Sequence, residues 1–239
     1  MFALGAFLAK FGVVLLKLKA LIVLGSMLVS VAAYALFYGW SFAIGLVLLI
    51  FVHEMGHVVV LRRQGIPASA PVFLPFLGAF VKMRGTPRDA WQEAVSGLAG
   101  PVAGSIGAAG VWWYADATGS QFLRALAFVG FLINLFNLLP VLPLDGGRAA
   151  AALHPAIWAV GLAGLIVLEV YHPSPVIPLI LVLGGLELWR RWKSRGTEAS
   201  RRYYQITRAQ RWAIGSGYIA LAGALVLGMH ATYLARPLH

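Results

Sequence analysis

Residues 41–61 read SFAIGLVLLIFVHEMGHVVVL, an apolar run that contains two histidines and a glutamate in its second half. An α-helix needs about 20 predominantly apolar residues to cross a bilayer, and this run meets that length. Ionisable side chains inside such a helix are unfavourable unless they bind something or face a cavity. The run therefore predicts a transmembrane helix that carries a buried polar site.

The rest of the chain has the same membrane character. Of its 239 residues, 60% are hydrophobic and 11% are charged, and the mean hydropathy is +0.82. A soluble domain of this size cannot bury that much apolar surface. Further apolar runs lie at about 20–39, 92–115, 121–140, 156–171, 174–190 and 212–234. We expect a single all-α polytopic membrane domain over residues 1–239, with seven transmembrane helices, or six if the short runs 156–171 and 174–190 do not both form full helices.

The basic residues predict the orientation of the chain. The formal net charge is +11, from 19 Lys and Arg residues against 8 Asp and Glu residues. The basic residues lie in short segments beside the apolar runs, a pattern that sets membrane orientation and does not point to nucleic acid. With the N-terminus in the cytoplasm, all of them except Arg124 and Arg236 fall on the cytoplasmic side. We therefore expect a multi-pass protein of the cell membrane, with a cytoplasmic N-terminus and the lipid bilayer as a partner.

Residues 1–19 differ from the other apolar runs because Lys10, Lys17 and Lys19 interrupt them. This pattern favours an amphipathic segment at the membrane surface, placed before the first span. The tripeptide Ala33-Tyr34-Ala35 loosely matches a signal-peptidase site, but the apolar run continues beyond it. An uncleaved helix is the better interpretation.

The motif His53-Glu54-Met55-Gly56-His57 carries the predicted chemistry. Residues four apart share one face of a helix, so both imidazoles can approach the same metal ion, and Glu54 can reach a water bound to that ion. The two histidines lie about 6 and 12 Å inside the expected cytoplasmic end of the helix, at 1.5 Å per residue. The alternative is a set of buried polar residues that neighbouring helices satisfy.

A catalytic zinc site usually has three protein ligands and a water. The chain has no cysteine, so the third ligand must be a histidine or a carboxylate. Asp145 ends the fourth apolar run on the same side of the membrane as the motif, whereas His154 is expected at the edge of the bilayer. The residues around Asp145 include helix breakers, which let the backbone bend toward a ligand or mark an ordinary helix end. These breakers are Pro140, Pro143, Gly146 and Gly147.

Two separated motifs resemble the site-2 protease family of intramembrane zinc metalloproteases. They are His53-Glu54-Met55-Gly56-His57 and the later run Asn137-Leu138-Leu139-Pro140-Val141-Leu142-Pro143-Leu144-Asp145-Gly146-Gly147. The resemblance implies one Zn²⁺ per chain, held by His53, His57 and Asp145, with Glu54 as the catalytic base. It also implies that Asn137 contacts the substrate or the transition state. The catalytic core would cover about 41–150, followed by C-terminal helices at about 156–234, in a minimal form without a PDZ or CBS domain.

Residues 71–84 are apolar, but they are too short and too rich in proline for a span. The family resemblance suggests a short re-entrant β element here. Its exposed edge, which includes Gly78, Ala79, Phe80 and Val81, would bind an unwound substrate segment by strand addition. A lipid-anchored loop is the alternative.

The third apolar run has a face of small residues, at which neighbouring helices can approach closely. We interpret this face as scaffold. Its members are Gly97, Gly100, Pro101, Gly104, Gly107 and Ala108.

Together these features predict a zinc-dependent endopeptidase. The resemblance implies that it hydrolyses peptide bonds within or next to the transmembrane segments of membrane-tethered protein substrates, near the cytoplasmic face. The alternatives are an intramembrane metal transporter, in which His and Asp line an ion path, and an inactive membrane scaffold that retains a metal site.

Overall fold

The computed structural model describes residues 2–154 and 156–234, with side chains described from Ala20 onward. Arg236, which is predicted to lie on the non-cytoplasmic side, is outside this part of the chain. The described elements are α1 (Phe2–Tyr38), α2 (Trp40–Arg63), β1 (Val72–Leu74), β2 (Gly78–Phe80), α3 (Ala90–Thr118), α4 (Gln121–Asn137), α5 (Asp145–Leu153), α6 (Ala156–Tyr171), α7 (Val176–Ser194), α8 (Glu198–Tyr203) and α9 (Arg208–Thr232).

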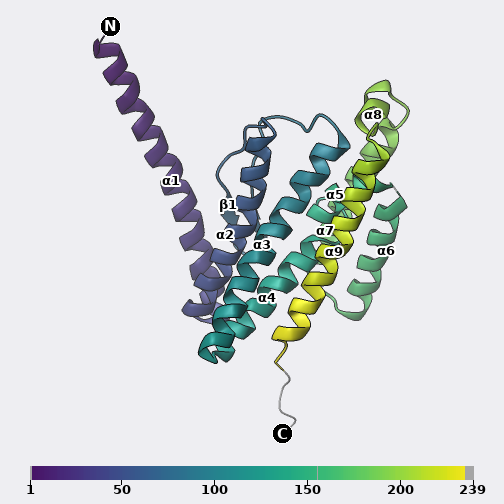
Figure 1. The fold of residues 1–239 in the computed structure, drawn as a ribbon. Helices are drawn as coiled ribbons and strands as arrows, with labels where there is room; N and C mark the ends of the chain where they lie inside the picture. Colours follow the sequence, from purple (N-terminus) through teal and green to yellow (C-terminus); the bar gives the residue numbers. More distant parts are fainter. Residues whose placement is uncertain (1, 155, 235–239) are drawn as a thin grey trace.

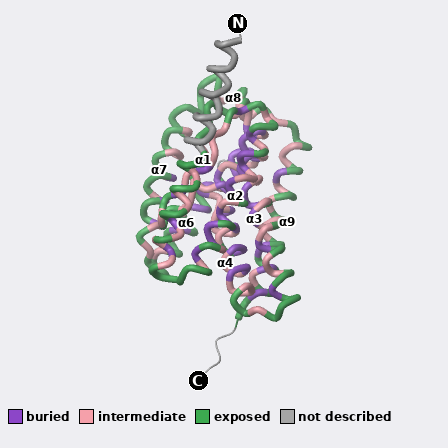
Figure 2. Tube along the Cα trace, turned by 90° about the vertical axis from the view of Figure 1, so that its left-hand side faces the viewer, coloured by how far each residue is buried: buried purple, intermediate pink, exposed green. Residues whose placement is uncertain are grey.

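Four helical segments are long and apolar enough to cross a membrane: Ala20–Tyr38, Trp40–Arg63, Ala90–Thr118 and Arg208–Thr232. The outer faces of these helices expose large apolar side chains, including Leu36, Ile106 and Ile219. Exposed residues lie along the outside of the bundle (Figure 2), and many exposed large apolar side chains are characteristic of contact with lipid or protein partners. The helical, multi-pass membrane character is therefore confirmed, whereas the number of six or seven spans stays a prediction because α4 and α6 are shorter apolar helices.

The first helix differs from the expected pattern in its backbone. Residues 1–19 were expected to form a segment separate from the first span, but α1 runs without interruption from Phe2 to Tyr38. Nothing between Lys19 and Ala20 breaks a helix, because neither residue is proline or glycine. The expected amphipathic character concerns side chains that lie outside the described part.

At the centre of the bundle, α2, α3 and α4 pack side by side (Figure 1). Most of the predicted small-residue face of α3 is turned inward. Gly107 is half-buried, and the buried members are Gly97, Gly100, Pro101, Gly104 and Ala108. On α2, a Cβ at Gly56 would collide with the main-chain carbonyl of Ala99 on α3. Small residues on both helices therefore bring the α2 and α3 backbones close together.

Between α4 and α5 the chain is irregular and buried. Leu138, Val141 and Leu142 are almost fully covered, and the Leu142–Pro143 peptide bond is cis. Glycines on α6 and α7 lie against this segment: a Cβ at Gly161 would collide with Pro140, and one at Gly184 with Leu142. Irregular backbone at membrane depth is tolerated only when protein buries it or when it lines a cavity. The predicted helix break is thus a covered segment, and it delivers Asp145 to the start of α5.

The predicted β element is a two-stranded antiparallel hairpin. Val72 pairs with Phe80, Phe73 with Ala79, and Leu74 with Gly78. The buried Phe73 ring packs in an apolar cluster with residues of α1 and α2, and the Phe73 N–H donates to Ser26 Oγ at 3.2 Å. These contacts fix the hairpin against α1 and α2. Whether it enters the membrane stays a prediction.

Candidate active site

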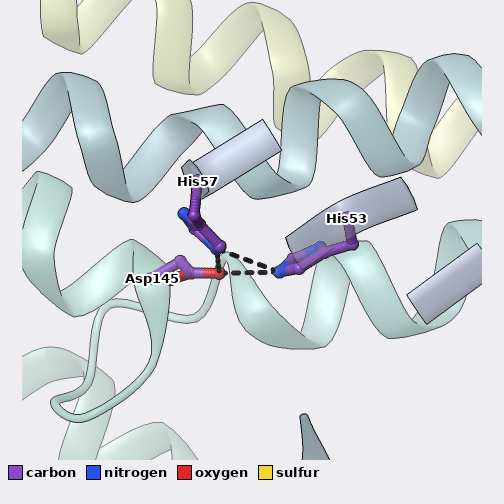
Figure 3. A group of neighbouring side chains, drawn as sticks. All are labelled: His53, His57 and Asp145. Carbon is purple, nitrogen blue, oxygen red and sulfur yellow. Dashed lines mark hydrogen bonds and ion pairs between the residues drawn. The ribbon is translucent and has the colours of Figure 1, made fainter. Parts of the chain in front are cut away.

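His53, His57 and Asp145 meet at one point in the protein interior (Figure 3). Asp145 Oδ2 lies 3.0 Å from His53 Nε2 and 3.1 Å from His57 Nε2, and the two Nε2 atoms are 3.2 Å apart. All three residues are buried. The histidines come from one face of α2 because they are four residues apart, and Asp145 is the first residue of α5. The three side chains form a group that can hold a metal ion.

The hydrogen bonds behind the imidazoles determine which nitrogen carries the proton. His57 Nδ1 lies 2.8 Å from the main-chain carbonyl of Ser96, which can only accept, so this nitrogen is the donor. His53 Nδ1 lies 2.8 Å from Asn134 Oδ1. The amide of Asn134 has a defined orientation because its Nδ2 donates to the Gly130 carbonyl at 2.7 Å. His53 is therefore also protonated at Nδ1 when it is neutral.

Both Nε2 atoms consequently direct lone pairs toward Asp145 Oδ2. Three acceptor atoms then converge with no proton between them, an arrangement that favours a cation. Two imidazole nitrogens and one carboxylate oxygen are a common protein ligand set of catalytic zinc, with a fourth position left for water or substrate. The donor set thus fits Zn²⁺.

The small-residue face of α3 makes room for this group. A Cβ at Gly100 would collide with the His57 ring and lie 2.7 Å from His53 Nε2. A Cβ at Gly97 would lie 2.9 Å from the Asp145 carbonyl and 3.0 Å from Arg148 Cβ. A side chain at Gly100 would therefore displace the imidazoles, so the scaffold face also shapes the site.

Glu54 and His53 line a cavity of about 450 Å³ next to this group. Its walls come from α1, α2, the hairpin, α4 and α7. Asn137 also lines the cavity, and its Nδ2 donates to the Ile133 carbonyl at 3.0 Å. A buried carboxylate therefore lies beside a chamber that is lined mainly by apolar residues.

The four residues expected to bind substrate are placed differently from one another. Gly78 and Ala79 line the cavity, whereas Phe80 and Val81 do not. The Phe80 side chain is exposed because successive side chains on a strand point to opposite faces. Val81 lies beyond the end of β2.

His154, the weaker candidate for a third ligand, is exposed at the far end of α5. Its Nδ1 accepts a hydrogen bond from the Ala156 N–H. The structure therefore places His154 away from the two motif histidines.

Sequence reasoning missed Asn134 and Arg148. Arg148 donates to Ser96 Oγ at 2.7 Å, and its guanidinium lies 3.9 Å from Asp145 Oδ1. Asn134 precedes Asn137 by three residues on α4, whose other polar residues, Gln121 and Arg124, lie in its first turn. Its position one turn away on the same face could have identified it.

A second polar cluster fixes the α7 side of the cavity. Arg191 on α7 pairs with Glu93 on α3, with nitrogen–oxygen distances of 2.7 and 3.1 Å. The Tyr203 hydroxyl donates to Glu93 at 2.6 Å. Burial and the negative charge of Glu93 raise the pKa of the Tyr203 phenol well above its usual value. The same helix, α7, supplies Leu179, Ile180 and other residues to the cavity wall.

The apolar helices and the buried His53–His57–Asp145 group define a membrane protein with a candidate metal centre, and comparison with known proteins identifies the family. The model of peptidase family M50 matches residues 41–118 and 114–160, which is half of the chain. The chain belongs to this family, the site-2 protease family, and the predicted resemblance is confirmed.

Two curated relatives have names that contain the words zinc metalloprotease. The zinc metalloprotease Rip3 of Mycobacterium tuberculosis is 35% identical over 118 residues, which cover 46% of this chain and 30% of Rip3. The zinc metalloprotease MJ0392 of Methanocaldococcus jannaschii is 28% identical over 111 residues, which cover 44% of this chain and 31% of the relative. The chain thus matches about a third of the length of these relatives.

Proposed function

We propose that this protein is an intramembrane zinc metalloprotease that hydrolyses peptide bonds within or next to transmembrane segments of membrane-tethered substrates. One observation carries the proposal. Two histidines protonated at Nδ1 and one carboxylate oxygen converge beside Glu54, at the wall of a cavity of about 450 Å³. Family membership and the names of the relatives support the same chemistry.

In this proposal His53, His57 and Asp145 hold one Zn²⁺ per chain. The bound ion supplies Lewis acidity, which polarises a carbonyl and lowers the pKa of a coordinated water toward about 7. The Ser96 carbonyl and the Asn134 amide keep the two imidazoles in the tautomer that ligation requires. The protein thus supplies oriented ligands and a site shielded from bulk water.

Glu54 is the proposed general base. It follows His53 directly in the chain, and its side chain faces the cavity in which the scissile bond would lie. Its carboxylate would accept a proton from the attacking water and transfer it to the leaving amine. The Asn137 amide has two N–H protons, and one of them is donated to the Ile133 carbonyl. The second N–H would stabilise the developing oxyanion.

The hairpin is the proposed substrate-binding element. A transmembrane helix hides its carbonyls in hydrogen bonds to residues four positions later, so the substrate must unwind locally before cleavage. An extended segment can add to the free edge of a two-stranded sheet. Gly78 and Ala79 line the same cavity as Glu54, so a segment paired with β2 would pass the proposed base. The main-chain groups of Ala79 and Val81 would face this edge, whereas those of Phe80 face Val72 within the hairpin.

The proposed orientation has the N-terminus in the cytoplasm of a cell, six or seven spans in the cell membrane, and the site about two helical turns below the cytoplasmic surface. The basic residues that end α2 and α7, including Arg62, Arg63 and Arg191, support this orientation. Figure 1 shows α1 beginning at one end of the bundle and α9 ending at the other, which supports seven spans over six, because an odd number of crossings places the two ends on opposite sides.

The sequence is compatible with two other functions. A metal transporter needs polar groups along a path, and within the described residues one His/Asp/Glu group could hold a metal ion. The remaining candidate is an inactive scaffold with a metal site, which differs from a protease only because it does not cleave a peptide substrate. Zinc uptake into proteoliposomes distinguishes the transporter, and the variant below distinguishes the scaffold.

The direct test of function is cleavage of a model transmembrane substrate by the full chain reconstituted in proteoliposomes. Glu54→Gln should retain zinc and lower the cleavage rate by about 100-fold or more, the contribution expected of a general base. Glu198→Gln is the matched control, because Glu198 is exposed on α8 and pairs with Arg202. Full activity of the Glu54→Gln protein would overturn the assignment.

A further inference from the structure

We propose that Asn134 is a positioning residue of the metal site, and that its role is distinct from that of Asn137 one turn further along α4. This inference rests on the proposed function. It assigns to Asn134 the control of zinc affinity through His53, and it leaves to Asn137 contact with the reacting peptide.

The Asn134 side chain uses both ends of its amide. It is 3% exposed, its Oδ1 accepts from His53 Nδ1 at 2.8 Å, and its Nδ2 donates to the Gly130 carbonyl at 2.7 Å. The reverse orientation would place the amide oxygen against a carbonyl oxygen. Asn134 is therefore a fixed acceptor facing His53.

That acceptor determines the state of the His53 ring. With Nδ1 as donor, the lone pair of Nε2 faces Asp145 Oδ2 at 3.0 Å. Without the Asn134 oxygen, the buried Nδ1–H of His53 has no partner, and the His53 ring can rotate or change tautomer. Removal of such a partner of a metal-ligating histidine lowers metal affinity by about 10–100-fold.

The two histidines differ in how their rings are held. His57 Nδ1 donates to the main-chain carbonyl of Ser96, which no side-chain substitution removes. His53 depends on a side chain. A substitution at Asn134 therefore acts on one ligand and leaves the other in place.

A glycine on α3 supports this assignment independently. A Cβ at Gly104 would collide with the Asn134 amide, so the helices approach each other here only because this position has no side chain. At Gly110 on the same helix, a Cβ would meet nothing within 4 Å. Gly104→Ala should therefore displace the Asn134 amide without removing any polar group, and Gly110→Ala is its control.

Asn137 shows a different environment. Its Nδ2 donates to the Ile133 carbonyl, its side chain is half-buried, and it lines the cavity. The Nδ1 atoms of the two histidines contact Asn134 and Ser96, and their Nε2 atoms contact Asp145 and each other. Among the described hydrogen bonds of these histidines, none goes to Asn137. Asn137→Ala should therefore keep the zinc affinity of the wild type.

The test measures the zinc dissociation constant of the full chain in detergent, by competition with a chromophoric chelator. Asn134→Ala should weaken zinc binding by about 10–100-fold. Two further variants separate the His53 contact from the helix contact. Asn134→Asp keeps an acceptor for His53 but loses the donor to Gly130, whereas Asn134→Ser can bond the Gly130 carbonyl but is too short to reach His53.

If Asn134 positions His53, the Asp variant retains zinc affinity and the Ser variant loses it as the Ala variant does. If Asn134 only stabilises α4, the Ser variant retains affinity and the Asp variant loses it, and the inference is wrong. The visible spectrum of the Co²⁺-substituted protein gives a second readout, which should change in Asn134→Ala and Gly104→Ala and stay unchanged in Gly110→Ala.

The failure of this inference and the failure of the proposed function give different results. A wild-type protein that binds no zinc contradicts the function itself. A wild-type protein that binds zinc, with equal affinity in Asn134→Ala and Gly104→Ala, contradicts the role of Asn134 alone. Helix content measured by circular dichroism shows that each variant is folded.

Discussion

Arg191 at the end of α7 forms a two-pronged ion pair with Glu93 at the start of α3, with the closest nitrogen and oxygen atoms 2.7 Å apart. Tyr203 and Tyr204 complete the cluster, and the guanidinium lies 5.3 Å from the centre of the Trp158 ring. The pair joins helices that are distant in sequence, and it holds the helix that forms one wall of the active-site cavity.

Arg191→Gln should lower the free energy of unfolding by about 3 kcal/mol, because it leaves the buried Glu93 carboxylate without its charged partner. Unfolding in a denaturing detergent measures this loss. Arg190→Gln is a control on the neighbouring residue, whose side chain is 74% exposed, and it should change stability by less than about 0.5 kcal/mol. Equal stability of the two variants would show that the cluster does not hold α7.

The raised pKa of Tyr203 predicts a pH effect. In the unfolded chain a tyrosine loses its proton near pH 10, whereas folded Tyr203 keeps it because of burial and the Glu93 charge. Above about pH 10 the folded state thus binds more protons than the unfolded state, and stability falls as pH rises. In Tyr203→Phe this decline should be shallower. An identical pH profile of the two proteins would count against the Tyr203–Glu93 contact.

The hairpin proposal predicts that substrate binding depends on the main chain of β2. Ala79 faces the free edge with its main-chain N–H, because its partner Phe73 donates its own N–H away from β2 to Ser26. Ala79→Pro removes this donor and should raise KM by about tenfold, the effect of one or two hydrogen bonds. Phe80→Ala should have little effect, because this side chain is exposed and does not line the cavity. If KM were unchanged in the proline variant, strand pairing with the substrate would have to be abandoned.

The orientation can be measured with single cysteines, because the natural chain has none. Thr86 and Ala117 are exposed at opposite ends of the loop–helix segment formed by residues 86–118. A membrane-impermeant maleimide should label Thr86→Cys from the cytoplasmic side and Ala117→Cys from the other side. Reversed labelling would invert the topology, and labelling from one side only would exclude α3 as a span.

Local patterns predicted those parts of the fold that depend on neighbouring residues. Helical spacing places His53 and His57 on one face, and the proline and glycine residues before Asp145 predict a break in the helix. The hydrophobic runs predict α2 and α3 within a few residues of their ends. Each of these features depends on local geometry and on the lengths that a bilayer requires.

Features that depend on helix packing could not be predicted in this way. The contact between Asn134 and His53 exists because α3 and α4 approach closely at Gly104. Which side of β2 faces the cavity depends on the packing of Phe73 against α1 and α2, and this is why Phe80 lies outside the cavity. Arg148 reaches Ser96 only after α5 packs on α3.

The most direct test of the central claim is the zinc content of the purified full chain, measured by mass spectrometry for the wild type and for alanine variants of three residues. The account predicts one zinc per wild-type chain, loss of zinc in His53→Ala and Asp145→Ala, and full zinc in His154→Ala. A full complement of zinc in Asp145→Ala, together with its loss in His154→Ala, would contradict the proposed site.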